Sequence, residues 1–178
     1  GHSFSITPLH IVKAYASLSN NGYIVNPTFI LNSETKSSHN ILLRKDSSAY
    51  FLDLLNAVIT KTKFTGPRVK IDGYNIGGKT GTSELINSSG RYYKDRNMTS
   101  FIGIFPINKP KYVVYTAISY PKKPIDSKQR MTGAVVNAPL VKKIIYEMIK
   151  ILNLPSVRHD TYIKADIKQI YNSDYAFF

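Results

Sequence analysis

The sequence predicts an α+β fold in which helices pack on an antiparallel sheet. Two amphipathic segments occupy the first third of the chain, three β-rich segments follow in the middle, and another amphipathic segment comes after them. Short turns separate the β-rich segments, and short turns join antiparallel strands, whereas parallel strands need a longer crossover. The 178 residues suffice for one domain with a hydrophobic core.

The first amphipathic segment starts at Thr7-Pro8 and stops at residues 20–22, Asn-Asn-Gly. Thr7 is a suitable N-cap because its hydroxyl can accept from the first-turn N–H groups, and Pro8 fits the first turn of a helix. A second helix is predicted to start at a cap formed by Asp46 or Ser47. Its apolar residues share one face: Phe51, Leu54, Leu55 and Val58.

Between these helices, residues 23–31 are apolar and β-branched, which predicts a short strand interrupted by Pro27. Residues 32–40 predict a polar loop. Residues 74–83 form two alternating sets of side chains, which is the pattern of a strand, and they contain an unusual number of glycines. Two further strands are predicted, Met98–Pro106 and Tyr112–Pro121.

A loop rich in Lys and Pro, residues 121–131, precedes the last predicted helix at residues 139–152. We expect residues 1–152 to form one folded domain. Residues 153–178 are expected to form a C-terminal tail whose aromatic end covers apolar surface of that domain.

Composition excludes several classes of site. The formal charge is +13, but the basic residues are spread along the sequence without a nucleic-acid-binding motif, so we interpret them as a lysine-rich surface and expect no nucleic-acid partner. The absence of cysteine excludes disulfides and thiolate metal sites. The four histidines show no metal-ligand spacing, and we predict neither a metal nor a cofactor.

The candidate chemistry lies in residues 77–82, Gly-Gly-Lys-Thr-Gly-Thr. Residues 73–80 formally match the phosphate-binding pattern G-x-x-x-x-G-K-[ST]. That pattern requires an apolar strand before it and a helix that starts at its lysine. Residues 67–72 are too polar for such a strand, and Gly81 disfavours a helix. Nucleotide binding therefore stays as the less favoured alternative.

The second interpretation is the K-T-G strand of serine acyltransferases. Lys79 would supply positive charge for a substrate carboxylate and for proton transfer. Thr80 and Thr82 share a face because they are two residues apart, and their hydroxyls would hold a carboxylate. The N–H of Thr82 would be one of two donors to the oxyanion, and Gly81 would let the substrate lie close. The motif alone is also compatible with a glycine-rich edge strand that has no chemistry.

Several further segments make the chain similar to class B penicillin-binding proteins. They occur in the family's order and at its spacing, over roughly residues 1–152, and the segment after the K-T-G strand is closest to the septal, cell-division branch. These segments are Gly1–Leu9 with Asn21-Gly22, Gly90-Arg91-Tyr92, Ser100–Gly103 with Phe105-Pro106, and Gly133-Ala134-Val135 with Ala138-Pro139.

The resemblance implies a β-lactamase/transpeptidase-like fold that lacks its N-terminal part, so that residues 1–152 form the C-terminal half of the transpeptidase domain. It implies a penicillin-binding peptidoglycan D,D-transpeptidase, which acylates a serine with a stem peptide ending in D-Ala-D-Ala and passes the acyl group to an amine. The implied partners are the stem peptide, β-lactam antibiotics and, through the parent chain, divisome membrane proteins. The implied location is the periplasmic side of the bacterial inner membrane.

The resemblance also places the nucleophilic serine upstream of the Thr-Pro-Leu helix, outside this chain. Three matches occur within the chain, Ser33 with Lys36 for S-x-x-K and the S-x-N patterns that begin at Ser38 and Ser19. Ser33 is predicted in a polar loop, and one residue separates Lys36 from Ser38, so we interpret them as coincidences. We expect this chain alone to be inactive, either as an excised part of an intact enzyme or as a non-catalytic remnant of a split gene.

Overall fold

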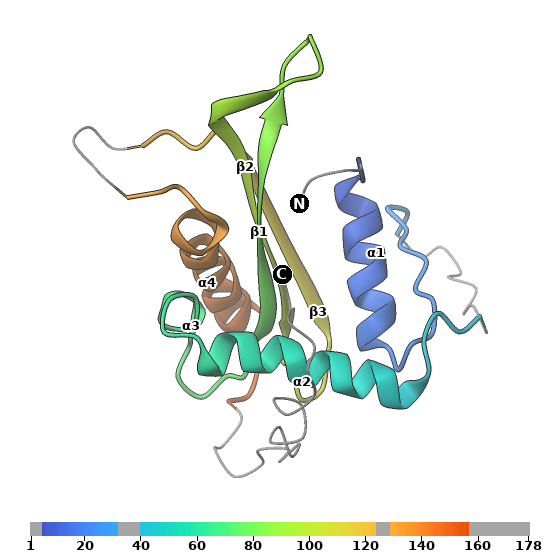
Figure 1. The fold of residues 1–178 in the computed structure, drawn as a ribbon. Helices are drawn as coiled ribbons and strands as arrows, with labels where there is room; N and C mark the ends of the chain where they lie inside the picture. Colours follow the sequence, from blue (N-terminus) through green and yellow to red (C-terminus); the bar gives the residue numbers. More distant parts are fainter. Residues whose placement is uncertain (1–4, 32–39, 124–128, 157–178) are drawn as a thin grey trace, which may run out of the picture.

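The structure is a computed structural model that describes residues 5–31, 40–123 and 129–156. Within these residues, helices lie on both faces of a three-stranded antiparallel sheet (Figure 1). The elements in chain order are α1 (Pro8–Ser19), α2 (Lys45–Lys61), α3 (Gly66–Val69), β1 (Gly77–Ile86), β2 (Tyr92–Phe105), β3 (Tyr112–Ser119) and α4 (Gly133–Ile151). The α+β prediction is confirmed.

The strand order is β1-β2-β3, so β2 is central and β1 is an edge strand. In the described part of the chain no strand pairs with the other side of β1. The register places Thr80 opposite Phe101 and Thr82 opposite Thr99. Because side chains alternate along a strand, Thr80 and Thr82 lie on one face of the sheet and Lys79 lies on the other.

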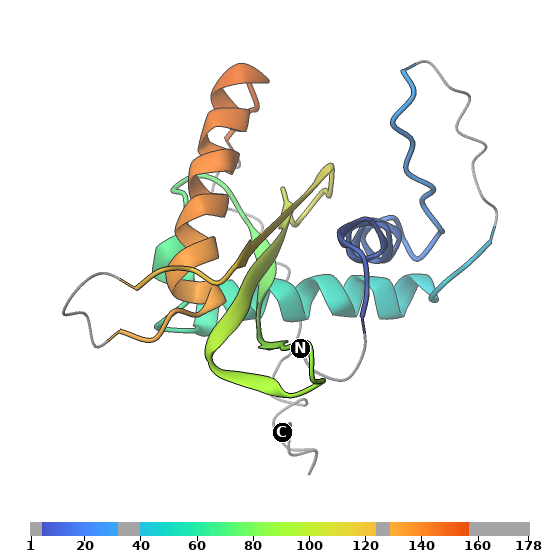
Figure 2. The ribbon, with the colours of Figure 1, turned by 90° about the horizontal axis from the view of Figure 1, so that it is seen from above.

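Helix α4 lies on one side of the sheet and α1 on the other, and α2 runs across from the α4 side to the α1 side, as the view from above shows (Figure 2). On the α4 face, Phe101 and Phe105 are completely buried in a cluster that includes Val141 and Ile145. Full burial of a side chain of this size contributes about 1.5–3 kcal/mol. This cluster fixes α4 against the middle of the sheet.

On the opposite face, Leu55 of α2 packs with Ile104 and Ile107 in a second buried cluster. Tyr15 and Phe51 extend it through an edge-to-face contact with ring centroids 5.5 Å apart. Both faces of the sheet are thus covered near the first residues of β1. This packing holds the candidate motif in place.

The first helix confirms its predicted cap, since the N–H of His10 donates to the Thr7 hydroxyl at 3.3 Å. The predicted cap of α2 is wrong, because the helix begins at Lys45 and its N-cap, Arg44, makes no side-chain cap bond. Asp46 lies inside the first turn, where a carboxylate interacts favourably with the helix dipole.

The predicted strand at residues 23–31 is also wrong. Tyr23 forms a single isolated bridge with Ile41, and Phe29, Ile30 and Leu31 are largely exposed. Strand formation needs a partner as well as β propensity, and no neighbouring strand in the described part of the chain pairs with this segment.

The last helix begins at Gly133 rather than at the predicted Pro139, which lies inside it. A proline in a helix removes one backbone hydrogen bond and usually bends or ends the helix. Here Ala134, Ala138 and Val141 are buried on the α4 face of the fold, and this packing supports the turns on both sides of Pro139. The polar loop predicted at residues 32–40 and the tail predicted at residues 153–178 lie almost wholly outside the described residues.

Candidate functional site

The candidate residues lie together in the middle of edge strand β1. Lys79 is exposed, and its Nζ donates to the carbonyl of Thr80 at 3.0 Å. Thr80, Gly81 and Thr82 are partly buried. Because Lys79 lies within a strand and not at the start of a helix, the phosphate-loop alternative lacks the geometry that it requires.

The N-terminus of α4 contacts the same strand. The N–H of Gly133, the first residue of α4, donates to the Thr82 hydroxyl at 3.3 Å. A Cβ at Gly133 would overlap the carbonyl oxygen of Ser100 and lie 2.8 Å from that of Gly81. Only glycine lets the helix approach the strand this closely.

This contact has an electrostatic consequence. A helix of 19 residues carries partial positive charge at its N-terminus, and the first turn of α4 meets β1 at Thr82. Lys79 adds a full positive charge from the other face of the sheet. The middle of β1 is thus flanked by positive potential on both faces, which suits recognition of a carboxylate.

A groove of about 830 Å³ opens beside Thr82 on the α4 side of the sheet. It runs from the second half of β1, past β2, to the segments that flank the β3–α4 connection. Its described lining residues are Thr82, Glu84, Arg96, Asn97, Tyr120, Pro121, Lys122, Lys123, Gln129, Arg130, Met131 and Thr132. This groove was not predicted from the sequence, although the Lys- and Pro-rich loop at residues 121–131 was a signal for it.

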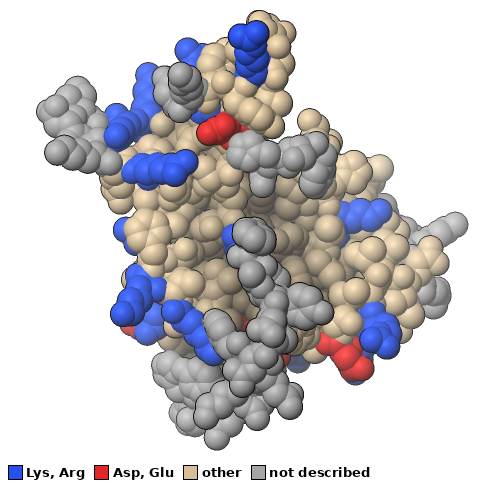
Figure 3. Space-filling view, in the orientation of Figure 1, with Lys and Arg blue, Asp and Glu red and all other residues tan. Residues whose placement is uncertain are grey.

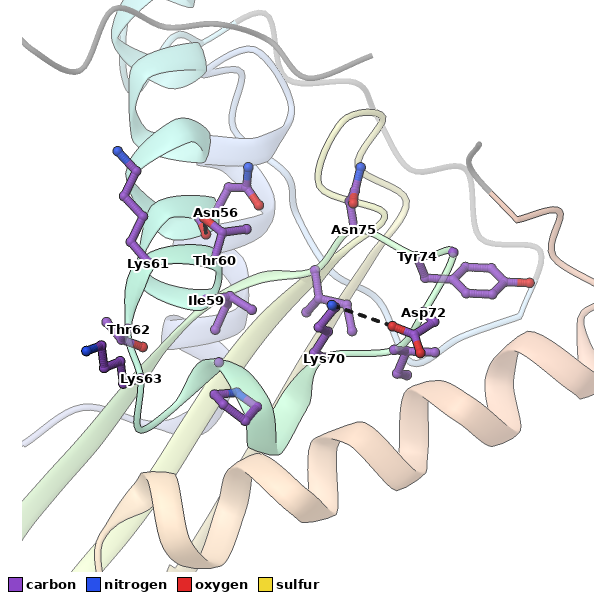
Figure 4. Close-up of a pocket in the computed structure, with 15 residues that line it drawn as sticks. Asn56, Ile59, Thr60, Lys61, Thr62, Lys63, Lys70, Asp72, Tyr74 and Asn75 are labelled. Carbon is purple, nitrogen blue, oxygen red and sulfur yellow. Dashed lines mark hydrogen bonds and ion pairs between the residues drawn. The ribbon is translucent and has the colours of Figure 1, made fainter. Parts of the chain in front are cut away.

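A second cavity of about 590 Å³ lies before β1, between the end of α2, α3 and residues 70–76 (Figure 4). The side chains of Lys61 and Lys63 lie on one side, and the ion pair of Lys70 and Asp72, 3.6 Å apart, lies on the other. None of residues 79–82 lines this cavity. It is therefore separate from the candidate motif.

The three sequence matches to a nucleophile or S-x-N element have different outcomes. Ser33, Lys36 and Ser38 lie outside the described residues. Ser19 is the last residue of α1, and its hydroxyl donates to the carbonyl of Ala16 at 3.0 Å. This is an ordinary bond for a serine at a helix end and does not bring Ser19 to the β1 motif.

The two groups whose ionisation burial shifts lie on α1 and α2. Burial raises the pKa of the Tyr15 hydroxyl and the pKa of the Asp53 carboxyl. In the part of the chain that the structure describes, no three His, Cys, Asp or Glu side chains group as metal ligands would. No helix formed by the described residues has the length and apolarity needed to cross a bilayer.

Comparison with known proteins identifies the family. Residues 1–146 match the family described as the penicillin binding protein transpeptidase domain. The chain belongs to this family. The class B resemblance is confirmed, and the nucleotide-binding alternative is not favoured.

Curated relatives support the assignment of this chain to the transpeptidase domain family. A peptidoglycan D,D-transpeptidase FtsI homolog from Mesostigma viride is 32% identical over an alignment of 190 residue positions. The alignment covers 92% of this chain and 31% of the relative. Stage V sporulation protein D of Bacillus subtilis is 27% identical, over 84% of this chain and 24% of the relative. The chain thus spans about a third or less of the length of these relatives.

Solved structures agree with the fold. Penicillin binding protein 3 of Mycobacterium tuberculosis matches with a TM-score of 0.71 and 25% identity, over 89% of this chain and 38% of that protein. The transpeptidase domain of penicillin-binding protein 3 from Burkholderia pseudomallei matches with a TM-score of 0.73 and 20% identity, over 88% of this chain and 45% of that chain. The Mycobacterium tuberculosis protein has also been solved in complex with ampicillin and with aztreonam.

Proposed function

We propose that residues 79–82 form one wall of the acyl-transfer site of a peptidoglycan D,D-transpeptidase. The observation that carries the proposal is the position of Lys79, Thr80, Gly81 and Thr82 on an edge strand of a penicillin-binding transpeptidase fold. An edge strand offers unpaired backbone N–H and C=O groups to an extended ligand. The glycine at position 81 lets that ligand approach the backbone.

The hydrogen bonding of Thr82 suits this role. Its hydroxyl accepts the N–H of Gly133, and a hydroxyl that accepts one bond keeps its own hydrogen for another acceptor. We propose that this hydrogen is donated to the carboxylate of the substrate, together with that of Thr80. The N–H of Thr82 is proposed as one of two donors to the oxyanion.

Lys79 is proposed to hold the substrate carboxylate and to support proton transfer through its positive charge. Its Nζ lies close to the strand because it donates to the carbonyl of Thr80. Removal of a single preorganised donor from such a site typically slows the reaction by about 100- to 1,000-fold. Loss of Lys79 is therefore expected to slow acylation by a similar factor.

The proposed reaction has two steps. A serine hydroxyl attacks the carbonyl carbon of the terminal D-Ala-D-Ala peptide bond, and the terminal D-Ala leaves with a proton on its amine. An amine of a neighbouring stem peptide then attacks the ester, which restores the serine hydroxyl. We propose that this serine lies outside residues 1–178, so that this chain supplies substrate recognition and not the nucleophile.

The wider role follows from the relatives, several of which are named peptidoglycan D,D-transpeptidases. We propose cell-wall cross-linking outside the cytoplasm, on the periplasmic side of the inner membrane, in cell division. The proposed partners are the stem peptide, β-lactam antibiotics and divisome membrane proteins. We also propose that residues 1–152 form the C-terminal half of the transpeptidase domain and that residues 153–178 form a tail that covers its apolar surface.

Labelling with fluorescent penicillin tests the proposal. The complete protein should form one covalent adduct, which mass spectrometry should locate on a serine outside residues 1–178. An adduct on Ser33 would contradict the assignment of the nucleophile. The absence of any adduct would contradict the proposed activity and favour the hypothesis that the chain is part of a non-catalytic remnant.

A further inference from the structure

The groove beside Thr82 is strongly basic. Its described lining contains four cationic side chains, those of Arg96, Lys122, Lys123 and Arg130, and one carboxylate, that of Glu84. Lys and Arg side chains gather at the upper left of the space-filling view, around the β3–α4 connection, with one acidic patch beside them (Figure 3). The local charge therefore favours an anionic ligand.

Arg96 is held in place by aromatic rings. Its guanidinium carbon lies 4.6 Å from the ring centroid of Tyr93 and 5.1 Å from that of Tyr120. Cation–π contacts of this kind restrict a side chain that is otherwise flexible. A planar guanidinium that is already oriented suits paired hydrogen bonds to a carboxylate.

The walls of the groove are tied together by hydrogen bonds. The side-chain amide of Asn97, on β2, donates to the carbonyl of Met131 at 2.8 Å. The N–H of Tyr120, at the end of β3, donates to the carbonyl of Asn97 at 2.8 Å. These bonds link β2 to both described ends of the β3–α4 connection. The walls of the groove are therefore held in position by hydrogen bonds.

The groove also continues from the proposed acyl-transfer site. Thr82 belongs to both, and the groove extends from it along β1 to Glu84. If the substrate carboxylate lies at Lys79 and Thr80 and the reacting carbonyl at the N–H of Thr82, as proposed above, the acyl side of the peptide points along β1 toward Glu84 and the groove. We propose that the groove binds carboxylates on the acyl side of the substrate, so that the enzyme prefers acidic acyl donors. This inference rests on the proposed function.

A matched pair of β-lactams tests it. Benzylpenicillin and carbenicillin differ by one carboxylate on the benzylic carbon of the acyl side chain. The second-order acylation rate of the complete protein is measured with both, for the wild type and for the triple variant K122Q/K123Q/R130Q. Loss of three nearby charges should lower the ratio of the carbenicillin rate to the benzylpenicillin rate by roughly five-fold.

Lys109→Gln is the matched control, since Lys109 is exposed in the β2–β3 turn and does not line the groove. It should leave the ratio unchanged, and added salt should weaken the wild-type preference because it screens exposed charges. A ratio that the triple variant leaves unchanged would overturn the inference while benzylpenicillin acylation still supports the proposed function. If neither compound acylates the wild type, the proposed function fails, and this inference fails with it.

Discussion

The N–H of Gly133 donates a hydrogen bond to the hydroxyl of Thr82, and this bond joins the first residue of α4 to the K-T-G strand. The contact sets the distance between helix and strand, because a side chain at Gly133 would meet the backbone of Ser100 and Gly81. It also orients the Thr82 hydroxyl. Helix α4 is therefore part of the candidate site, although its sequence carries none of the proposed reacting groups.

Gly133→Ala should destabilise the protein, because the new methyl group overlaps the carbonyl of Ser100. Overpacking of a buried site typically costs about 1–3 kcal/mol of unfolding free energy. Chemical denaturation measures this loss. Gly103→Ala is the control, since its Cβ would make ordinary contacts at 3.4 Å with Phe101 and Val141. Equal losses in both variants would contradict the proposed close approach of α4.

Thr82→Val keeps the shape of the side chain but removes its hydroxyl. We expect a loss of about 1–2 kcal/mol in unfolding free energy, because the N–H of Gly133 loses its acceptor. We also expect slower acylation by benzylpenicillin, because the hydroxyl is proposed to bind the substrate carboxylate. Thr82→Ser retains the hydroxyl and should restore both properties. A slow serine variant would indicate that the methyl group, and not the hydroxyl, matters.

The buried pair of Asn137 and Thr116 links α4 to β3. The Asn137 amide donates to the Thr116 hydroxyl at 3.1 Å, and both residues are buried. Asn137→Leu should cost about 1–3 kcal/mol because it leaves the Thr116 hydroxyl unpaired. The double variant N137L/T116V removes both polar groups and should recover much of that loss. Denaturation of the single and double variants measures the coupling, and strictly additive losses would contradict it.

Asp53 gives a prediction with a definite dependence on pH. Burial raises the pKa of its carboxyl, so the folded protein holds this proton more tightly than the unfolded chain does. The resulting stability is present below the ordinary carboxyl pKa and is lost as the pH rises through the raised value. Asp53→Asn should therefore be slightly more stable than the wild type at neutral pH, with no difference near pH 3. The gain should stay below about 1 kcal/mol, because solvent screens this partly exposed group. Thermal melts at both pH values measure it, and an equal gain at both would contradict the assigned cause.

Much of the fold could be predicted from local patterns. The cap at Thr7 and the alternation along β1 each depend on a short stretch of sequence, and both are confirmed. The placement of Thr80 and Thr82 on one face follows from the period of a strand and needs no tertiary information.

The features that were missed depend on contacts between distant segments. Residues 23–31 have β propensity but no strand to pair with in the described part of the chain. The first turns of α4 were not predicted, because a proline inside a helix usually bends or ends it and Pro139 lies inside α4. Burial of Ala138 and Val141 against the sheet supports the helix there. The basic groove joins Arg96 to Arg130, residues that only the folded sheet brings together.

The acylation rate of the Lys79→Ala variant of the complete protein tests the central claim most directly. If β1 is a wall of the acyl-transfer site, the second-order rate with benzylpenicillin should fall by roughly 100-fold or more. Lys109→Ala removes the same charge in the β2–β3 turn and should leave the rate within about two-fold of the wild type. Equal rates for Lys79→Ala and Lys109→Ala in folded proteins would show that the K-T-G strand takes no part in acyl transfer.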